Sequence, residues 1–128
     1  MKPATAEWIA KAEGDFRTAC REEQAADLPN FDAVCFHAQQ TAEKYLKARW
    51  VEADQDFPKI HDLDALLNLN LPLEPGWRGL HEALQRLTDL AVEVRHPGLV
   101  ADAEDPAEAV RTATPVREAV RASLGLPT

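Results

Sequence analysis

Residues 36–48 read FHAQQTAEKYLKA, from Phe36 to Ala48, and carry the clearest structural signal in the chain. The run contains no Gly or Pro and is rich in residues that favour an α-helix. Apolar residues recur in and just before it at steps of three and four, and they are Cys35, Ala38, Ala42, Tyr45 and Leu46. This pattern predicts an amphipathic helix whose apolar stripe packs into a core.

A second row of side chains lies on a different side of the same predicted helix and consists of His37, Gln40, Lys44 and Lys47. One histidine, one glutamine and two lysines in a row can bind an anion. The same row can be a solvated face whose charged residues form helix-stabilising pairs. The residue types alone leave both interpretations open.

The size and charge of the chain limit the classes of function. Its 128 residues suit one domain with one core, so we expect residues 1–128 to form a single helical domain. The formal net charge is −8 and the sequence pI is about 4.9. Because phosphate neutralisation needs a dense Lys/Arg patch, a basic nucleic-acid-binding surface is not expected. A small, locally positive site is compatible with an acidic chain.

The cysteines and the absence of long apolar runs predict a cytoplasmic protein. Cys20 and Cys35 are the two cysteines, and both fall on predicted apolar faces. We interpret them as small buried hydrophobic residues, with a disulfide or redox role as the alternative. The first residues show no apolar signal-peptide core, and no run approaches the roughly 20 apolar residues that cross a bilayer.

Prolines, glycines and capping residues divide the chain into helical segments. The predicted helices run from about Pro3 to Glu23, from Phe31 to about Ala53, from Asp62 to about Leu69, from near Pro75 to near Val94, and from residues 105–108 to Gly125. Asn30 and Asp62 are suited to cap the helices that follow them. Four long helices and one short helix, joined by short loops, predict an all-α fold, an up-down four-helix bundle with an additional short helix.

For two residues at the edges of these helices, the sequence leaves open whether the side chain is buried or exposed. Asp15 lies at the edge of the first helix's apolar stripe, where a buried carboxylate would need a Lys or His partner on the next helix; an exposed position is the alternative. Trp50 is either an exposed anchor for a dimer interface or a residue buried within the chain. Bundles of this size often extend their core into a dimer, so we expect a homodimer.

Four groups of residues are informative through their order and spacing along the chain. They are Trp8, Ala12, Asp15 and Ala19; Cys35-Phe36-His37-Ala38-Gln39-Gln40 with Glu43-Lys44 and Lys47-Ala48; His61-Asp62-Leu63; and Arg95-His96-Pro97. In this arrangement nearly the whole chain resembles the HEPN domain, a small helical module named for its occurrence in higher eukaryotes and prokaryotes and for nucleotide binding.

The resemblance implies a four- or five-helix bundle that commonly forms two-fold dimers. It also implies a partner, because many HEPN proteins occur beside a small nucleotidyltransferase and act with it as a toxin–antitoxin pair. Some HEPN proteins are ribonucleases that use an Arg followed, after four to six residues, by a His. In those enzymes the two copies of the motif face one cleft.

This chain departs from the ribonuclease pattern, because no Arg is followed by a His at the required offset. Arg95 and His96 are adjacent and supply the residue types that an in-line ribonuclease needs. Neighbouring helix residues point about 100° apart, however, which works against their meeting at one phosphate. We therefore expect a non-enzymatic protein.

The remaining candidate residues each have a structural alternative. Arg95 can clamp a phosphate, or it can interact with the carbonyls at a helix C-terminus. His96 can instead fill an aromatic slot, and Asp62 can act as a helix cap with His61 packed beside it. A metal site from His37, His61 and His96 lacks any tight ligand spacing, so neither a metal nor a cofactor is expected.

These observations favour a binding module that acts with a nucleotidyltransferase partner. Its nucleotide- or phosphate-binding residues would be His37, Gln40, Lys44, Lys47, His61, Asp62 and Arg95. The first alternative is a divergent ribonuclease toxin that uses Arg95 and His96 and binds nucleic acid; the second is a purely structural dimerisation module. Tyr45, the sole tyrosine, is expected in the core.

Overall fold

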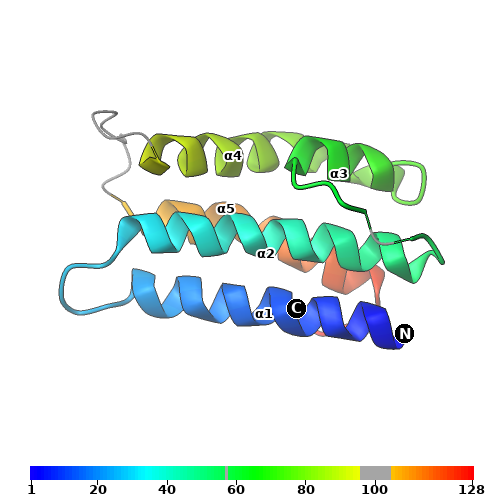
Figure 1. Cartoon of the computed structure of the whole chain (residues 1–128), viewed down its shortest axis with the longest axis horizontal. Coiled ribbons are helices and arrows are strands. Elements are labelled where there is room, and N and C mark those ends of the chain that lie inside the picture. Colours follow the sequence, from blue (N-terminus) through cyan, green and yellow to red (C-terminus); the bar gives the residue numbers. More distant parts are fainter. Residues whose placement is uncertain (57, 96–104) are drawn as a thin grey trace.

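The computed structural model describes residues 1–56, 58–95 and 105–128. Within these ranges all regular secondary structure is helical. The elements are α1 (Pro3–Glu23), α2 (Phe31–Glu52), α3 (Leu63–Asn70), the 3₁₀ helix η1 (Pro75–Leu80), α4 (His81–Arg95) and α5 (Ala107–Ser123). The four long helices alternate in direction along the chain, which confirms the predicted up-down bundle with one additional short helix (Figure 1).

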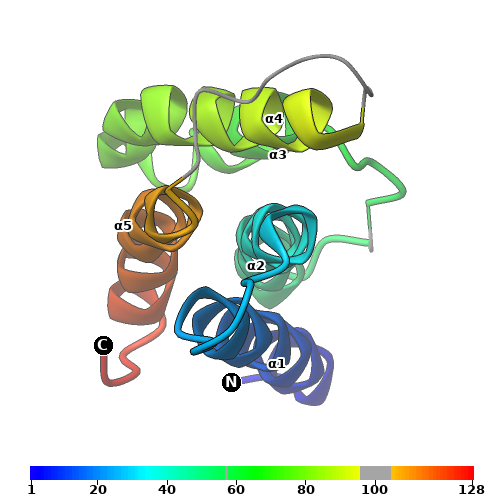
Figure 2. The same cartoon turned by 90° about the vertical axis from the view of Figure 1, so that its left-hand side faces the viewer.

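Helix α2 occupies the centre of the bundle. Figure 2 looks roughly along α1, α2 and α5, while α4 lies across the view. In it, α1 lies on one side of α2, α3 and α4 lie on the other, and α5 closes the bundle beside α2. The stripe predicted from the sequence is buried, since Ala38, Ala42, Tyr45 and Leu46 are each 0% exposed. Leucines of α3 and α4 and valines of α5 complete this core, among them Leu66, Leu84, Leu87, Leu90, Val116 and Val120.

The predicted caps are present. The side chain of Asn30 accepts a hydrogen bond from the backbone N–H of Ala33, and that of Asp62 accepts one from Ala65, at 3.1 and 3.0 Å. The start of α5 differs: the sequence predicts Asp105 as the cap and Pro106 as the first helical residue, whereas the helix begins at Ala107 with Pro106 at the N-cap and no side-chain cap. Asp105 still accepts a hydrogen bond from the N–H of Ala107 at 3.0 Å.

The segment predicted as one helix from Pro75 is two elements. Its first six residues form η1, and the α-helix begins only at His81. Gly76 and Gly79 lower the α-helical preference of this turn, while Trp77 is 7% exposed and anchors it to the core.

Both cysteines lack a disulfide, and they differ in burial. Cys35 is buried as predicted, whereas Cys20 is only partly buried. Trp50 is half-buried, and its indole N–H donates to the carbonyl of Asp56 at 3.0 Å, so its burial falls between the exposed and the buried position that the sequence left open. None of the described helices combines the length and the apolar character needed to span a membrane.

A charged cluster joins α1, α2 and α5. Arg117 donates to both carboxylate oxygens of Glu13 at 2.8 Å, and the Tyr45 hydroxyl donates to the same carboxylate at 2.5 Å. The Arg117 hydrogen bonds lower the pKa of Glu13 from 4.5 to about 2, against the opposing effect of burial. Burial raises the pKa of Tyr45 to about 12. The sole tyrosine is therefore a neutral core residue, as the sequence predicted.

We predict that Glu13 makes the fold acid-sensitive. Because its pKa is lower in the folded state, its stabilisation is complete above pH 4.5 and is lost as the pH falls towards 2. Glu13→Gln should lower the free energy of unfolding at neutral pH by about 1 kcal/mol, allowing for solvent screening, and should flatten its acid dependence. Urea unfolding across this pH range measures both effects. Glu7→Gln, on the exposed side of α1, is the control, and an unchanged slope in Glu13→Gln would contradict the assignment.

Candidate functional site

The polar row of α2 is divided between two acidic partners. His37 Nδ1 lies 2.8 Å from one oxygen of Asp15, and Lys44 Nζ lies 2.5 Å from the other. The Asp15 side chain is 11% exposed, which confirms that this carboxylate takes both a Lys and a His partner from the next helix. Because Asp15 offsets the charge of Lys44 and also engages His37, this part of the row presents less positive potential to an anion than the sequence pattern indicates.

Lys47 does not lie on a solvated face. It is 1% exposed, and its Nζ lies 3.2 Å from a carboxylate oxygen of Glu43. The same ammonium group lies 5.5 Å from the ring centroid of Trp8 in α1. The interpretation of the whole row as a solvated face is therefore wrong for Lys47, because α1 packs over this part of α2.

Glu43 links the centre of α2 to the segment before α3. Its Oε2 is 3.2 Å from both Lys47 Nζ and His61 Nδ1, while its buried Oε1 has no hydrogen-bond partner among the described residues. Glu43 belongs to the sequence pattern that resembles the HEPN domain, but it was not selected as a ligand-binding residue. Its position four residues before Lys47 is the helical ion-pair spacing that could have identified it.

A cavity of about 120 Å³ opens beside this group, between α2, the start of α3 and α4. We call it the α2–α4 cavity, and it is lined by Gln39, His61, Asp62, Leu63, Thr88, Ala91 and Val92. Gln40 donates from its amide to Gln39 at 2.8 Å and so supports the rim. Asp62 caps α3 and also lines the cavity, so its position is compatible with both the capping role and the ligand-binding role.

The α4 wall of this cavity leads towards Arg95. Thr88, Ala91 and Val92 follow one another at helical spacing, and Arg95, the last residue of α4, follows Val92 by three positions. The backbone position of Arg95 is thus on the same face of α4 as the cavity. His96 lies outside the described residues. Thr88 and Val92 were not selected from the sequence, although they precede Arg95 by seven and three positions, which is the spacing of one helix face.

Two exposed apolar side chains lie near the cavity. Val92 is 46% exposed, and Phe36, one helical turn before Gln39, is 44% exposed. An apolar side chain that remains half in water favours burial against another surface. Within the described residues, no group of three His, Cys, Asp or Glu side chains is arranged to hold a metal ion.

The sequence profile of the HEPN domain family matches residues 5–123, nearly the whole chain. Neither the curated proteins nor the solved structures gave a significant match. The family match agrees with the helical bundle, and the chain belongs to the HEPN domain family.

We predict that the buried Glu43–Lys47 pair is costly to break from one side. Lys47→Met keeps the aliphatic stem but leaves the Glu43 carboxylate buried without this partner, so it should destabilise the fold by about 3 kcal/mol. Adding Glu43→Gln should recover most of the loss. Thermal and urea unfolding of the single and double variants form a double-mutant cycle. Lys44→Met is the control, because Asp15 retains His37, and a double variant no more stable than Lys47→Met would contradict the prediction.

Proposed function

We propose that this HEPN-family protein is a homodimeric binding module that holds a nucleotide at the α2–α4 cavity and acts with a small nucleotidyltransferase in a toxin–antitoxin-like pair. The observation that carries the proposal is the convergence of His61 and Asp62 with Gln39 in one cavity, on the face of α4 that ends at Arg95. Of the candidate ligand-binding residues, His61 and Asp62 line this cavity, and the backbone of Arg95 follows its α4 wall, which supports the proposal.

The charges around the cavity favour a particular orientation of the ligand. Asp62 lines the cavity and the Glu43 carboxylate lies just behind His61, so the cavity itself disfavours a phosphate. Carboxylates and the Gln39 amide are suited instead to the hydroxyl and amino groups of a nucleoside. Arg95, at the end of α4, is the residue for the phosphate. His37 and Lys44, held by Asp15, then have a structural role.

The size of the cavity supports a dimer. Pockets that enclose small organic ligands measure roughly 300–1,000 Å³, whereas this one measures about 120 Å³. One chain therefore accommodates only part of a nucleotide. A second copy that packs on Phe36 and Val92 would bury these side chains and supply the missing wall.

The proposed nucleotidyltransferase partner rests on the family resemblance, and the burial of Tyr45 limits how such a partner could act on this chain. A nucleotidyltransferase can act on a HEPN chain either through a shared ligand or by modifying it. The sole tyrosine, Tyr45, is 0% exposed and donates its hydroxyl proton to Glu13, so it offers no accessible nucleophile in the folded protein. This supports a shared ligand as the basis of the pairing.

We predict that ATP or GTP raises the melting temperature of the purified protein by mass action. Arg95→Ala should abolish the rise by removing the phosphate contact. Asp62→Asn keeps a good helix cap but loses the carboxylate, so it should weaken nucleotide binding and leave binding of inorganic phosphate unchanged. A thermal-shift titration measures these effects.

Two controls separate this site from the alternatives. Arg17→Ala removes an exposed arginine of α1 and should keep the full ligand response, as should Lys44→Ala despite a lower melting temperature. Loss of the response in Lys44→Ala alone would move the site to the α2 row. No response to any nucleotide, together with growth arrest on expression that Arg95→Ala relieves, would favour the ribonuclease alternative.

We predict that Phe36→Glu and Val92→Glu each convert the dimer to a monomer, because a carboxylate in an apolar interface is strongly disfavoured. Sedimentation and light scattering measure the change in mass. Leu28→Glu, in the α1–α2 connection, is the matched control, since Leu28 is 89% exposed and lies away from the cavity. A dimer that persists in both Phe36→Glu and Val92→Glu would place the interface on another face.

A further inference from the structure

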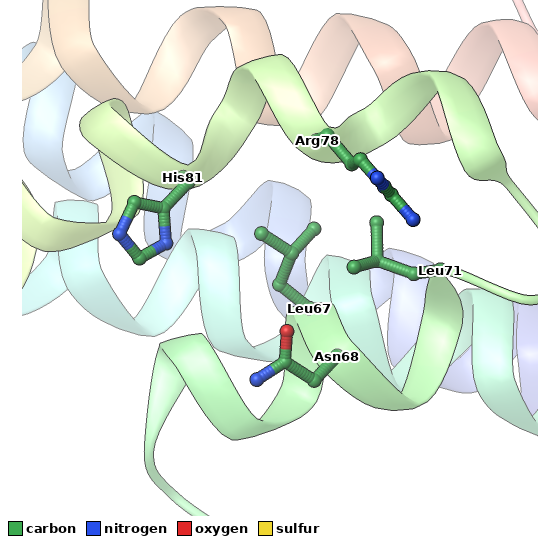
Figure 3. Close-up of a pocket in the computed structure, with 5 residues that line it drawn as sticks. All are labelled: Leu67, Asn68, Leu71, Arg78 and His81. Atoms are coloured by element: carbon green, nitrogen blue, oxygen red, sulfur yellow. The ribbon is translucent and has the colours of Figure 1, made fainter.

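A second and larger cavity lies at the other end of α4. It measures about 360 Å³ and is lined by Leu67, Asn68, Leu71, Arg78 and His81. Figure 3 shows that these side chains come from two opposing elements, the second half of α3 with the residue after it, and the turn that leads into α4. None of the five residues belongs to the α2–α4 cavity. We call this the α3–η1 pocket.

The floor of the α3–η1 pocket is apolar. Leu67 is 1% exposed and belongs to the core, and Leu71 is half-buried at the end of α3. The pocket is open to solvent on its other side, where Asn68, Arg78 and His81 are exposed. A ligand that fits this surface has a compact apolar part for the floor and a polar part for the rim.

The polar groups on the rim have hydrogen-bonding capacity to spare. Among the described residues, the Arg78 guanidinium makes no ion pair, and the Asn68 amide makes no hydrogen bond. His81 is oriented by Asp64, whose Oδ1 lies 2.6 Å from Nδ1, so that Nε2 remains available. Most other arginines of the described chain are engaged, including Arg49, Arg86, Arg111, Arg117 and Arg121.

In a chain of net charge −8, an arginine that makes no ion pair with the described residues and stands beside leucines leaves its positive charge open to an anionic ligand. The position of Arg78 is also fixed by its backbone, because its carbonyl accepts a hydrogen bond from the N–H of His81. Trp77, buried next to it, anchors the same turn. The backbone from which the Arg78 side chain extends is thus fixed beside the pocket by a packed turn.

We propose that the α3–η1 pocket binds a small monocarboxylate with an aliphatic or aromatic tail. The planar fork of Arg78 matches a carboxylate in bidentate geometry, and the Asn68 amide adds a further donor. Leu67 and Leu71 receive the tail. A single arginine balances a single negative charge, whereas a phosphate dianion in the presence of Asp64 is left undercompensated.

This site is independent of the proposed nucleotide site. The two cavities lie towards opposite ends of α4, which has 15 residues and is about 22 Å long at 1.5 Å per residue. Arg95→Ala therefore leaves the α3–η1 pocket intact, and Arg78 variants leave the nucleotide response intact. Failure of either proposal is distinguishable from failure of the other.

The test titrates the full chain with phenylbutyrate and follows backbone amide signals by NMR. We expect saturable shifts confined to residues 67–71 and 78–81, with an affinity about tenfold weaker in Arg78→Gln, as for the loss of a charge-assisted hydrogen bond. Asn68→Asp should weaken binding by repulsion. Arg17→Gln, an exposed α1 arginine that lines neither cavity, should bind as the unmodified protein does.

One neutral analogue and one doubly charged analogue test whether the pocket prefers a monocarboxylate. Phenylbutyramide has the same tail without the charge and should bind at least tenfold more weakly than phenylbutyrate. Phenylbutyl phosphate should not bind more tightly than the carboxylate. Equal binding of the amide, tighter binding of the phosphate, absence of saturable shifts in this pocket, or an equal loss in Arg17→Gln would each overturn the proposal.

Discussion

The enclosure of α2 is the constraint on which the rest of the structure depends. This helix contacts α1, α3, α4 and α5, so little of its surface reaches water (Figure 2). A charged side chain on a helix enclosed in this way must find a partner, because burying an unpaired charge costs several kcal/mol. Asp15 from α1 supplies one partner for His37 and Lys44, and Glu43 supplies the other for Lys47.

This internal pairing determines where a ligand can be recognised. The positive charges at the centre of α2 are balanced within the bundle, and the body of the protein is acidic. At the two proposed sites, the positive charge for an anionic ligand is therefore assigned to residues at the two ends of α4. Arg95 ends α4 and Arg78 stands just before its start, so the two proposed sites use the two ends of one helix.

The sequence predicted the fold well because its helix signals are local. Caps at Asn30 and Asp62, and the apolar stripe of α2, define boundaries and faces without knowledge of the neighbours. The burial of Lys47 could not be predicted in this way, because periodicity identifies one apolar face and not how many helices cover the others.

The α2–α4 cavity was only partly predicted, because its wall combines His61 and Asp62 with Thr88 and Val92, which are distant in the sequence. The partner of Asp15 was predictable in type, because a carboxylate beside an apolar stripe requires a cation.

The short helix α3 gives the two cavities a common wall. Leu63 at its start lines the α2–α4 cavity, whereas Leu67 and Asn68 in its second half line the α3–η1 pocket. Eight residues are too few for a helix to be stable by itself, so α3 depends on its cap, on its buried leucines and on Asn70, whose amide donates to the carbonyl of Leu46 in α2. The same contacts that attach α3 to α2 therefore fix the shape of both cavities. The two proposed sites depend on this attachment, because the charged groups at the centre of α2 are already paired within the bundle.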